Sequence, residues 1–322
     1  MHIFRGMLCQ DFSLSADCEK YTLAAVADGH GSLQYLRTDT GSRLAAECAF
    51  ACVDEFIESL DGVMEILDDE KRRNKLLHQL WKSIVSLWYA AIEDDFRENP
   101  FTDEELSRLP EEYAPYREYY KAGNYTMAYG TTLAFAVITD SCAFGAQIGD
   151  GKCVIINEDG SADEPIPDDP LCYDNVTTSM CQEDAEQCAR YFYFPKDRIP
   201  PAIFLNTDGI DKSYWNRELF HSFYKSLALL FVNNPINDAV DLLTGYLPDI
   251  SRLGSGDDVS CAGIINAPRL EKCADKLQED VDAQLAAEDE EMYGYTPEFT
   301  EDSVASEPVT ENEDKDNDRK DK

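Results

Sequence analysis

Three short apolar runs in the middle of the chain constrain its fold more than any other feature. Residues 131–138, 142–148 and 153–157 are separated only by the turns Thr139-Asp140-Ser141 and Gly149-Asp150-Gly151-Lys152. Runs of this length with such short connections predict an antiparallel meander. The first two runs are almost continuously apolar rather than alternating, so we expect both faces of their sheet to be covered.

The segments on either side supply material for such a cover. Apolar residues recur at helical spacing in 44–60 and 76–92, and further helices are expected at 215–231 and 237–247. Additional strand-like runs occupy 22–27, 190–194, 202–205 and 259–265. The charged, tyrosine-rich segment 93–123 reads as a helical excursion over the surface. Together these patterns predict sheets held between layers of helices.

The charge of the chain limits its partners. The net charge is −36 over 322 residues, which disfavours binding to nucleic acid or to anionic membranes. Residues 271–322 contain 19 acidic and 6 basic side chains, a net of −13. We therefore predict one folded domain at 1–268, with 158–200 as an insert or flap. The acidic tail at 269–322 is expected to be helical at first and then disordered.

Cysteine usage points to a reduced protein. The 11 cysteines are odd in number and include no Cys-x-x-Cys pair. Cys172, Cys181 and Cys188 lie in the polar insert, where zinc binding is an alternative, but they lack the spacing of a zinc site. The sequence shows neither a signal-peptide pattern nor an apolar stretch long enough to cross a membrane. These features predict a soluble, cytoplasmic protein, which we expect to be a monomer.

Four acidic turns follow or precede the strand-like runs. They contain Asp28-Gly29, Asp150-Gly151, Asp208-Gly209 and Asp257-Asp258. An aspartate at a strand end has a fixed carboxylate, and a following glycine leaves a backbone carbonyl accessible. Hard divalent cations prefer such oxygen ligands. Four such turns in one chain predict a site for two or more metal ions.

The order of these motifs resembles the metal-dependent protein phosphatase family, the type-2C serine/threonine phosphatases, and its bacterial members in particular. The matching segments are Cys9-Gln10-Asp11, Asp28-Gly29-His30-Gly31, Gly130-Thr131-Thr132, Ile148-Gly149-Asp150, Thr207-Asp208-Gly209-Ile210 and Gly256-Asp257-Asp258-Val259-Ser260. They span residues 1 to 266. The resemblance implies an α+β fold, a four-layer αββα sandwich of two antiparallel β-sheets flanked by helices, and makes 1–268 the catalytic domain.

The resemblance also implies a metal centre with two Mn²⁺ or Mg²⁺ ions. Asp28 would bridge both ions, and the carbonyl of Gly29 would bind one of them. Asp208 and Asp257 would complete the ligands of the other. Asp150 matches an acid that can hold a third, weaker ion; the alternative is that Asp150 is an ordinary turn residue.

The remaining roles concern protons and water. His30 matches the proposed general acid of the family, although it could instead only orient the site. Asp11 and Gln10 are expected to hold metal-bound waters rather than metals. Two cations neutralise the charge of a phosphate monoester and activate a bridging water for attack. An acid then protonates the leaving serine or threonine oxygen.

One departure from the family affects phosphate binding. Many members have an arginine where this chain has Gly6. Arg5 and His2 are the nearby cations that could replace it, yet strand alternation would point Arg5 to the opposite face.

The sequence thus predicts a Mn²⁺- or Mg²⁺-dependent phosphatase acting on phosphorylated serine and threonine residues of proteins, typically opposing a serine/threonine kinase. The alternatives are a catalytically silent phosphatase-like binding domain and a phosphatase for a small metabolite.

Overall fold

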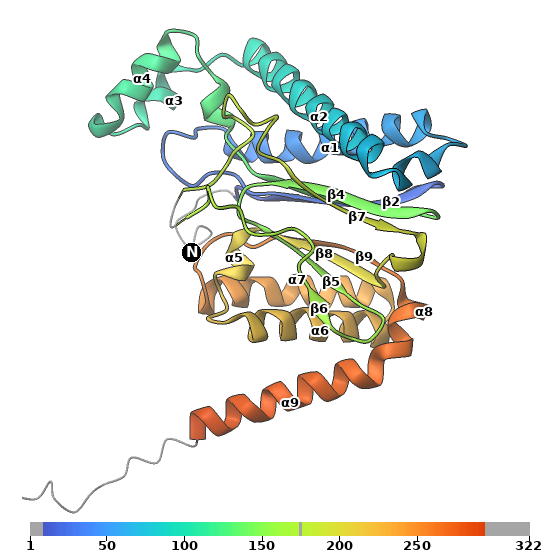
Figure 1. The fold of residues 1–322 in the computed structure, drawn as a ribbon. Coiled ribbons are helices and arrows are strands. Elements are labelled where there is room, and N and C mark those ends of the chain that lie inside the picture. Colours follow the sequence, from blue (N-terminus) through green and yellow to red (C-terminus); the bar gives the residue numbers. More distant parts are fainter. Residues whose placement is uncertain (1–8, 174–175, 294–322) are drawn as a thin grey trace, which may run out of the picture. The chain divides into compact units, whose positions relative to one another are not determined.

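The fold consists of two antiparallel sheets packed face to face. The computed structural model describes residues 9–173 and 176–293, of which those up to Asp282 belong to one compact unit and those from Ala283 to a second (Figure 1). The first sheet has the order β1 (Phe12–Asp17), β2 (Tyr21–Ala27), β3 (Leu133–Thr139), β4 (Cys142–Ile148) and β7 (Arg190–Pro195). The second has the order β6 (Ala162–Asp163), β5 (Lys152–Ile156), β8 (Ala202–Asn206) and β9 (Cys261–Ile265).

Helices cover the outer face of each sheet. Helices α1 (Thr38–Ser59) and α2 (Glu70–Glu98) lie on the first sheet, and α6 (Arg217–Asn233) and α7 (Ile236–Leu253) lie on the second (Figure 1). Each helix layer shares an apolar core with its sheet, and Trp81 and Trp88 of α2 are fully buried. The predicted α+β, four-layer αββα sandwich is confirmed.

A third core fills the space between the sheets. On the first sheet this layer is rich in small side chains, including Ala24, Ala134, Ala136 and Ala143. They face larger residues of the second sheet, among them Ile203 and Ile264. Strands β3 and β4 are therefore buried on both faces, which explains why their sequences are continuously apolar.

The predicted three-stranded meander is wrong in its last member. Strands β3 and β4 pair with each other, but β5 pairs with β6 and β8 in the other sheet. The chain passes from one sheet to the other at Gly149-Asp150-Gly151. Gly149 has a φ of +98°, a backbone angle that residues other than glycine rarely adopt. Because both sheets are covered on both faces, the apolar pattern alone does not reveal which sheet a strand joins.

Shorter elements connect these layers. They are the α-helices α3 (Asp103–Ser107), α4 (Ala114–Lys121), α5 (Asp208–Asp211) and α8 (Ala267–Leu270), and 3-10 turns at Met64–Asp68, Glu111–Tyr113, Thr126–Tyr129, Lys196–Arg198 and Glu271–Cys273. The sequence reading did not anticipate β1 or β6. Strand β1 alternates between partly buried and exposed residues at a sheet edge, and β6 has only two residues.

The last described helix is α9 (Ala274–Tyr293). Leu277 and Val281 are buried together with Leu270 and Cys273 in the core beneath α6. The chain is thus helical beyond residue 268, while the expected disorder concerns 294–322, outside the described residues.

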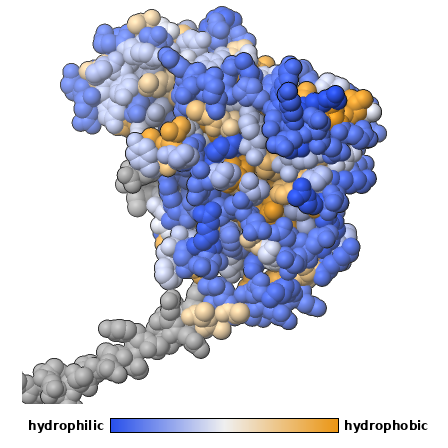
Figure 2. Space-filling model, viewed as in Figure 1, coloured by the Kyte–Doolittle hydropathy of each residue, from blue (hydrophilic) through white to orange (hydrophobic). Residues whose placement is uncertain are grey.

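The hydrophilic surface (Figure 2) and the free cysteines agree with the high charge and the odd number of cysteines in the sequence. No helix of the described part is long and apolar enough to cross a membrane, and the face shown in Figure 2 is mostly hydrophilic. All the cysteines are free thiols. Cys172, Cys181 and Cys188 contact hydroxyl or amide groups, and no group of three metal-binding side chains is found among residues 9–173 and 176–293.

Candidate active site

The acidic turns meet in one pocket. Strands β2, β4 and β8 end at the same edge of the sandwich at which β9 begins, because their neighbours are antiparallel. The pocket has a volume of about 670 Å³. Its lining includes Asp28, Gly29, His30, Asp150, Asp208 and Asp257, together with Thr177, Ser179 and Lys212. The structure therefore brings together every predicted metal ligand and the predicted general acid.

Backbone hydrogen bonds fix the turn that contains Asp28. Its N–H donates to Thr132 Oγ1 over 3.0 Å. Its carbonyl accepts from the Thr132 N–H at 2.8 Å and from Thr131 Oγ1 at 2.9 Å. The two threonines of the Gly130-Thr131-Thr132 motif thus hold the first aspartate in place.

Gly29 has no room for a side chain. A Cβ at this position would collide with Thr38 Oγ1 and with the carbonyl of Gln10. The Gly29 N–H donates to the Gln10 carbonyl over 3.2 Å, and the Gln10 N–H donates to Asp258 Oδ2 over 2.8 Å. Gln10 therefore joins the first acidic turn to the last through its backbone, whereas the sequence reading gave it a role through its side chain.

Asp11 lies behind the first turn. Thr207 Oγ1 donates to its Oδ2 over 2.7 Å, and the N–H of Ser260 donates to the same hydroxyl over 3.0 Å. Burial raises the pKa of Asp11 to about 7. Asp11 is thus held by the strand ends that carry Asp208 and Asp257.

The pocket gathers negative charge that its own side chains only partly balance. Burial and the charges of Asp11 and Asp208 raise the pKa of Asp28 well above its usual range. Burial and the charge of Asp208 likewise raise the pKa of Asp150. A divalent cation would relieve this repulsion. The donors are all oxygens, which fits Mg²⁺ or Mn²⁺ better than softer metals.

Lys212 neutralises part of this charge. Its ammonium group contacts the carboxylate of Asp208 and lies 3.8 Å from Asp150 Oδ2. As arranged, no three histidine, cysteine, aspartate or glutamate side chains of the described residues are grouped so that they could hold a metal ion. The aspartates of the pocket fit the predicted cations in chemistry and location. To bind an ion, their side chains must move closer together, and Asp208 must exchange Lys212 for the ion.

His30 is held by the segment predicted as a flap. Its Nε2 lies 2.7 Å from Ser179 Oγ, and its ring meets Tyr35 edge to face at 4.6 Å between centroids. Ser179 Oγ also lies 3.1 Å from the Thr131 carbonyl, which can accept a hydrogen bond from it. Burial lowers the pKa of His30 to about 4, which leaves the imidazole neutral at neutral pH.

The same segment also reaches Asp150. Thr177 Oγ1 donates to Asp150 Oδ1 over 2.9 Å, and Thr178 Oγ1 accepts from the Gly149 N–H at 2.9 Å. The sequence reading missed these hydroxyls and Lys212. The available signals were the Thr-Thr-Ser run at 177–179 inside an acidic segment and the four-residue spacing from Asp208 to Lys212.

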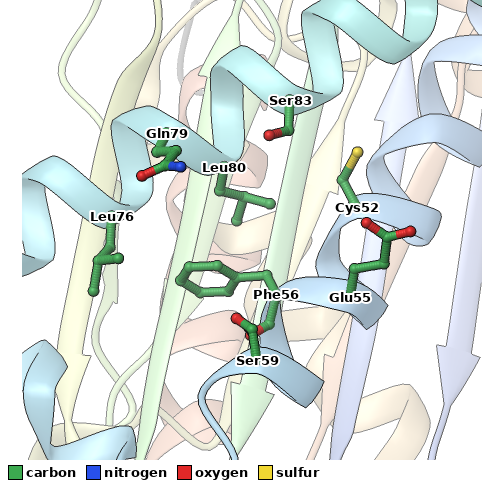
Figure 3. A pocket seen from close by; sticks show the side chains of 8 residues that line it. All are labelled: Cys52, Glu55, Phe56, Ser59, Leu76, Gln79, Leu80 and Ser83. Carbon is green, nitrogen blue, oxygen red and sulfur yellow. The ribbon is translucent and has the colours of Figure 1, made fainter.

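Two further observations delimit the site. Arg5 and His2, the expected phosphate-binding residues, lie outside the described residues, so their role stays a prediction. Another pocket, of about 250 Å³, lies between α1 and α2. Glu55 is the only acid among the side chains shown there (Figure 3). That pocket has no paired carboxylates with which to bind a metal.

Comparison with known proteins identifies the class as protein phosphatases. A model of the family described as Protein phosphatase 2C matches residues 1–242, so the chain belongs to this family. A comparison with curated proteins gives no match.

Solved structures with a related fold share little sequence with the chain. The serine/threonine phosphatase Stp1 from Staphylococcus aureus is 15% identical, with 79% of this chain and 87% of that chain covered and a TM-score of 0.45. The Mycobacterium tuberculosis serine/threonine phosphatase PstP/Ppp is 12% identical, with 80% and 92% covered and a TM-score of 0.45. A crystallised bacterial serine phosphatase is 16% identical, with 80% and 91% covered and a TM-score of 0.47.

Proposed function

We propose that the protein is a metal-dependent phosphatase that hydrolyses phosphoserine and phosphothreonine in proteins. The observation that carries the proposal is the convergence of Asp28, Asp150, Asp208 and Asp257 on one pocket in a chain of the protein phosphatase 2C family. Phosphorylated proteins are then its substrates, and a serine/threonine kinase is the enzyme it opposes.

Each acidic turn has a defined part in holding Mn²⁺ or Mg²⁺. Asp28 and the carbonyl of Gly29, together with Asp208 and Asp257, would hold two ions. Asp150 would hold a third, weaker ion. When bound, the ions supply positive charge to the phosphate oxygens and lower the pKa of a water to near neutrality.

The other residues bind and transfer protons. His30 gives a proton to the serine or threonine oxygen as it leaves, and Ser179 sets the orientation of the imidazole ring. Asp11, which accepts a hydrogen bond from Thr207, and Gln10 would hold waters bound to the ions from behind the pocket wall. The phosphate dianion also places negative charge near His30, which favours its protonated form.

Hydrolysis of a phosphothreonine peptide tests the proposal. We expect turnover with Mn²⁺, loss of turnover on adding a chelator, and loss in the Asp28→Ala and Asp257→Ala variants. A wild-type protein without metal-dependent turnover, or variants as active as wild type, would contradict it. Faster hydrolysis of small phosphorylated metabolites than of the peptide would favour a metabolite phosphatase.

A catalytically silent binding domain is the second candidate. The contact of Lys212 with Asp208 favours it, because an ammonium group already balances a carboxylate that a metal would need. Calorimetric titration with Mn²⁺ separates the two candidates. Only the silent domain predicts that the wild-type protein binds no Mn²⁺.

A further inference from the structure

Lys212 is placed to meet whatever enters the pocket. It follows α5 directly, and among the pocket-lining residues that the structure describes it is the only lysine or arginine. Its side chain is 44% exposed, whereas that of Asp208 is 12% exposed. The ammonium group therefore reaches from the pocket wall to a buried carboxylate while remaining open to solvent.

The backbone under Lys212 is fixed even though its side chain is not. The Lys212 N–H donates to the Asp208 carbonyl over 2.8 Å. The carbonyl of Gly209 accepts from Ser213 Oγ at 2.7 Å and from Ser255 Oγ at 2.8 Å. These bonds tie the turn to the loop before β9. The side chain, by contrast, is held at its end by ion pairs, so it can turn within the pocket on its flexible stem.

The chemistry of the Lys212 side chain suits an anionic ligand. A lysine ammonium is a compact point charge with three donors, and it is a common ligand of phosphate. A phosphate dianion entering a pocket lined by four aspartates meets repulsion, which a neighbouring ammonium group reduces.

We propose that Lys212 binds the phosphoryl group of the substrate, and that it leaves Asp208 for this purpose when a divalent cation takes that carboxylate. The inference rests on the proposed function and assigns a phosphate-binding residue to the site. The ion pair in the metal-free pocket and the phosphate contact in the loaded pocket are then two positions of one side chain.

This exchange predicts opposite changes in the affinities for the divalent cation and for phosphate. Removing the ammonium group frees Asp208, so a divalent cation no longer competes with Lys212 for this carboxylate and binds more tightly. The same change removes a donor to phosphate, so phosphate binds more weakly. An ion pair that only stabilised the fold would change neither affinity in a variant that still folds.

The variants Lys212→Met and Lys212→Arg test the exchange, with Lys276→Met as the matched control. Lys276 pairs with Asp280 over 2.6 Å, also across four residues, and its side chain is 56% exposed. Three quantities are measured on the purified full-length chain. They are the Kd for Mn²⁺ by calorimetry without substrate, inhibition by inorganic phosphate, and the KM for a phosphothreonine peptide.

We expect Lys212→Met to raise the KM and the inhibition constant of phosphate about tenfold. The same variant should bind Mn²⁺ about two- to fivefold more tightly. Lys212→Arg should keep phosphate affinity near that of wild type, and Lys276→Met should change none of the three quantities. Should Lys212→Met fold poorly by circular dichroism, Lys212→Gln replaces it.

The outcomes separate the two proposals. A wild-type protein that binds Mn²⁺ and turns over, with a KM and a Mn²⁺ affinity unchanged in Lys212→Met, would overturn the role of Lys212 and leave the phosphatase intact. A wild-type protein that neither binds Mn²⁺ nor turns over would overturn the proposed function, and the role of Lys212 with it.

Discussion

The two sheets contribute aspartates of the same pattern but of different charge balance. Asp28 directly follows β2 of the first sheet, where its neighbours include the acids Asp11 and Asp208 and burial raises its pKa. Asp208 begins α5, just after β8 of the second sheet, and is paired with Lys212. The first half of the pocket is therefore rigid and short of positive charge, whereas the second half carries a cation of its own. Equivalent positions in a motif need not be equivalent electrostatically.

Replacing Asp28, the aspartate in the half of the pocket that is short of positive charge, should have the largest effect on activity. We expect Asp28→Asn to lower metal-dependent turnover by about 10³-fold or more, because a carboxylate proposed to hold the metal ions becomes a neutral amide. In the presence of a chelator, Asp28→Asn should also raise the Tm by about 2–4 °C, since it removes a buried charge among like charges. Asp17→Asn, at an exposed strand end, is the control. A lower Tm in Asp28→Asn would show that other groups already compensate the charge of Asp28.

Replacing Asp208, whose charge Lys212 balances, should also reduce activity but should not stabilise the protein. Asp208→Asn is expected to lower turnover about 10²-fold. It leaves Lys212 without its nearest partner, so the Tm in chelator should stay the same or fall. The comparison of the two halves depends on this difference in sign. Equal increases of Tm in Asp28→Asn and Asp208→Asn would refute it.

The hydroxyl that orients His30 should matter less. Ser179→Ala removes the partner of His30 Nε2, so we expect kcat to fall about tenfold with little change in KM. Ser179→Thr keeps the hydroxyl and should recover much of the loss. Steady-state kinetics beside Ser59→Ala, an exposed serine on α1, provide the check. An unchanged kcat in Ser179→Ala would show that the contact between Ser179 and His30 does not contribute to catalysis.

The smallest effect is expected at Thr177. Thr177→Val removes the hydrogen bond to Asp150 Oδ1, which should shift the Mn²⁺ concentration giving half-maximal activity by about two- to threefold. Turnover at saturating Mn²⁺ should stay close to that of wild type. A large fall in turnover at saturation would instead make Thr177 part of the main metal centre.

Much of the fold and the acidic half of the site could be predicted from sequence. The helices at 44–60 and 76–92 and the aspartates at strand ends leave local patterns of spacing and turn chemistry. The sheet that β5 joins does not, because strands buried on both faces of either sheet look alike. The contact between His30 and Ser179 joins residues 149 positions apart, which no local pattern records.

The link at Gly149-Asp150-Gly151 has a mechanical consequence. It joins β4 of one sheet to β5 of the other within three residues and carries Asp150 at its centre. So short a link leaves the end of β4 and the start of β5 little freedom to separate, so the position of Asp150 is set by both sheets at once. A change in the packing between the two sheets would therefore be felt directly at Asp150.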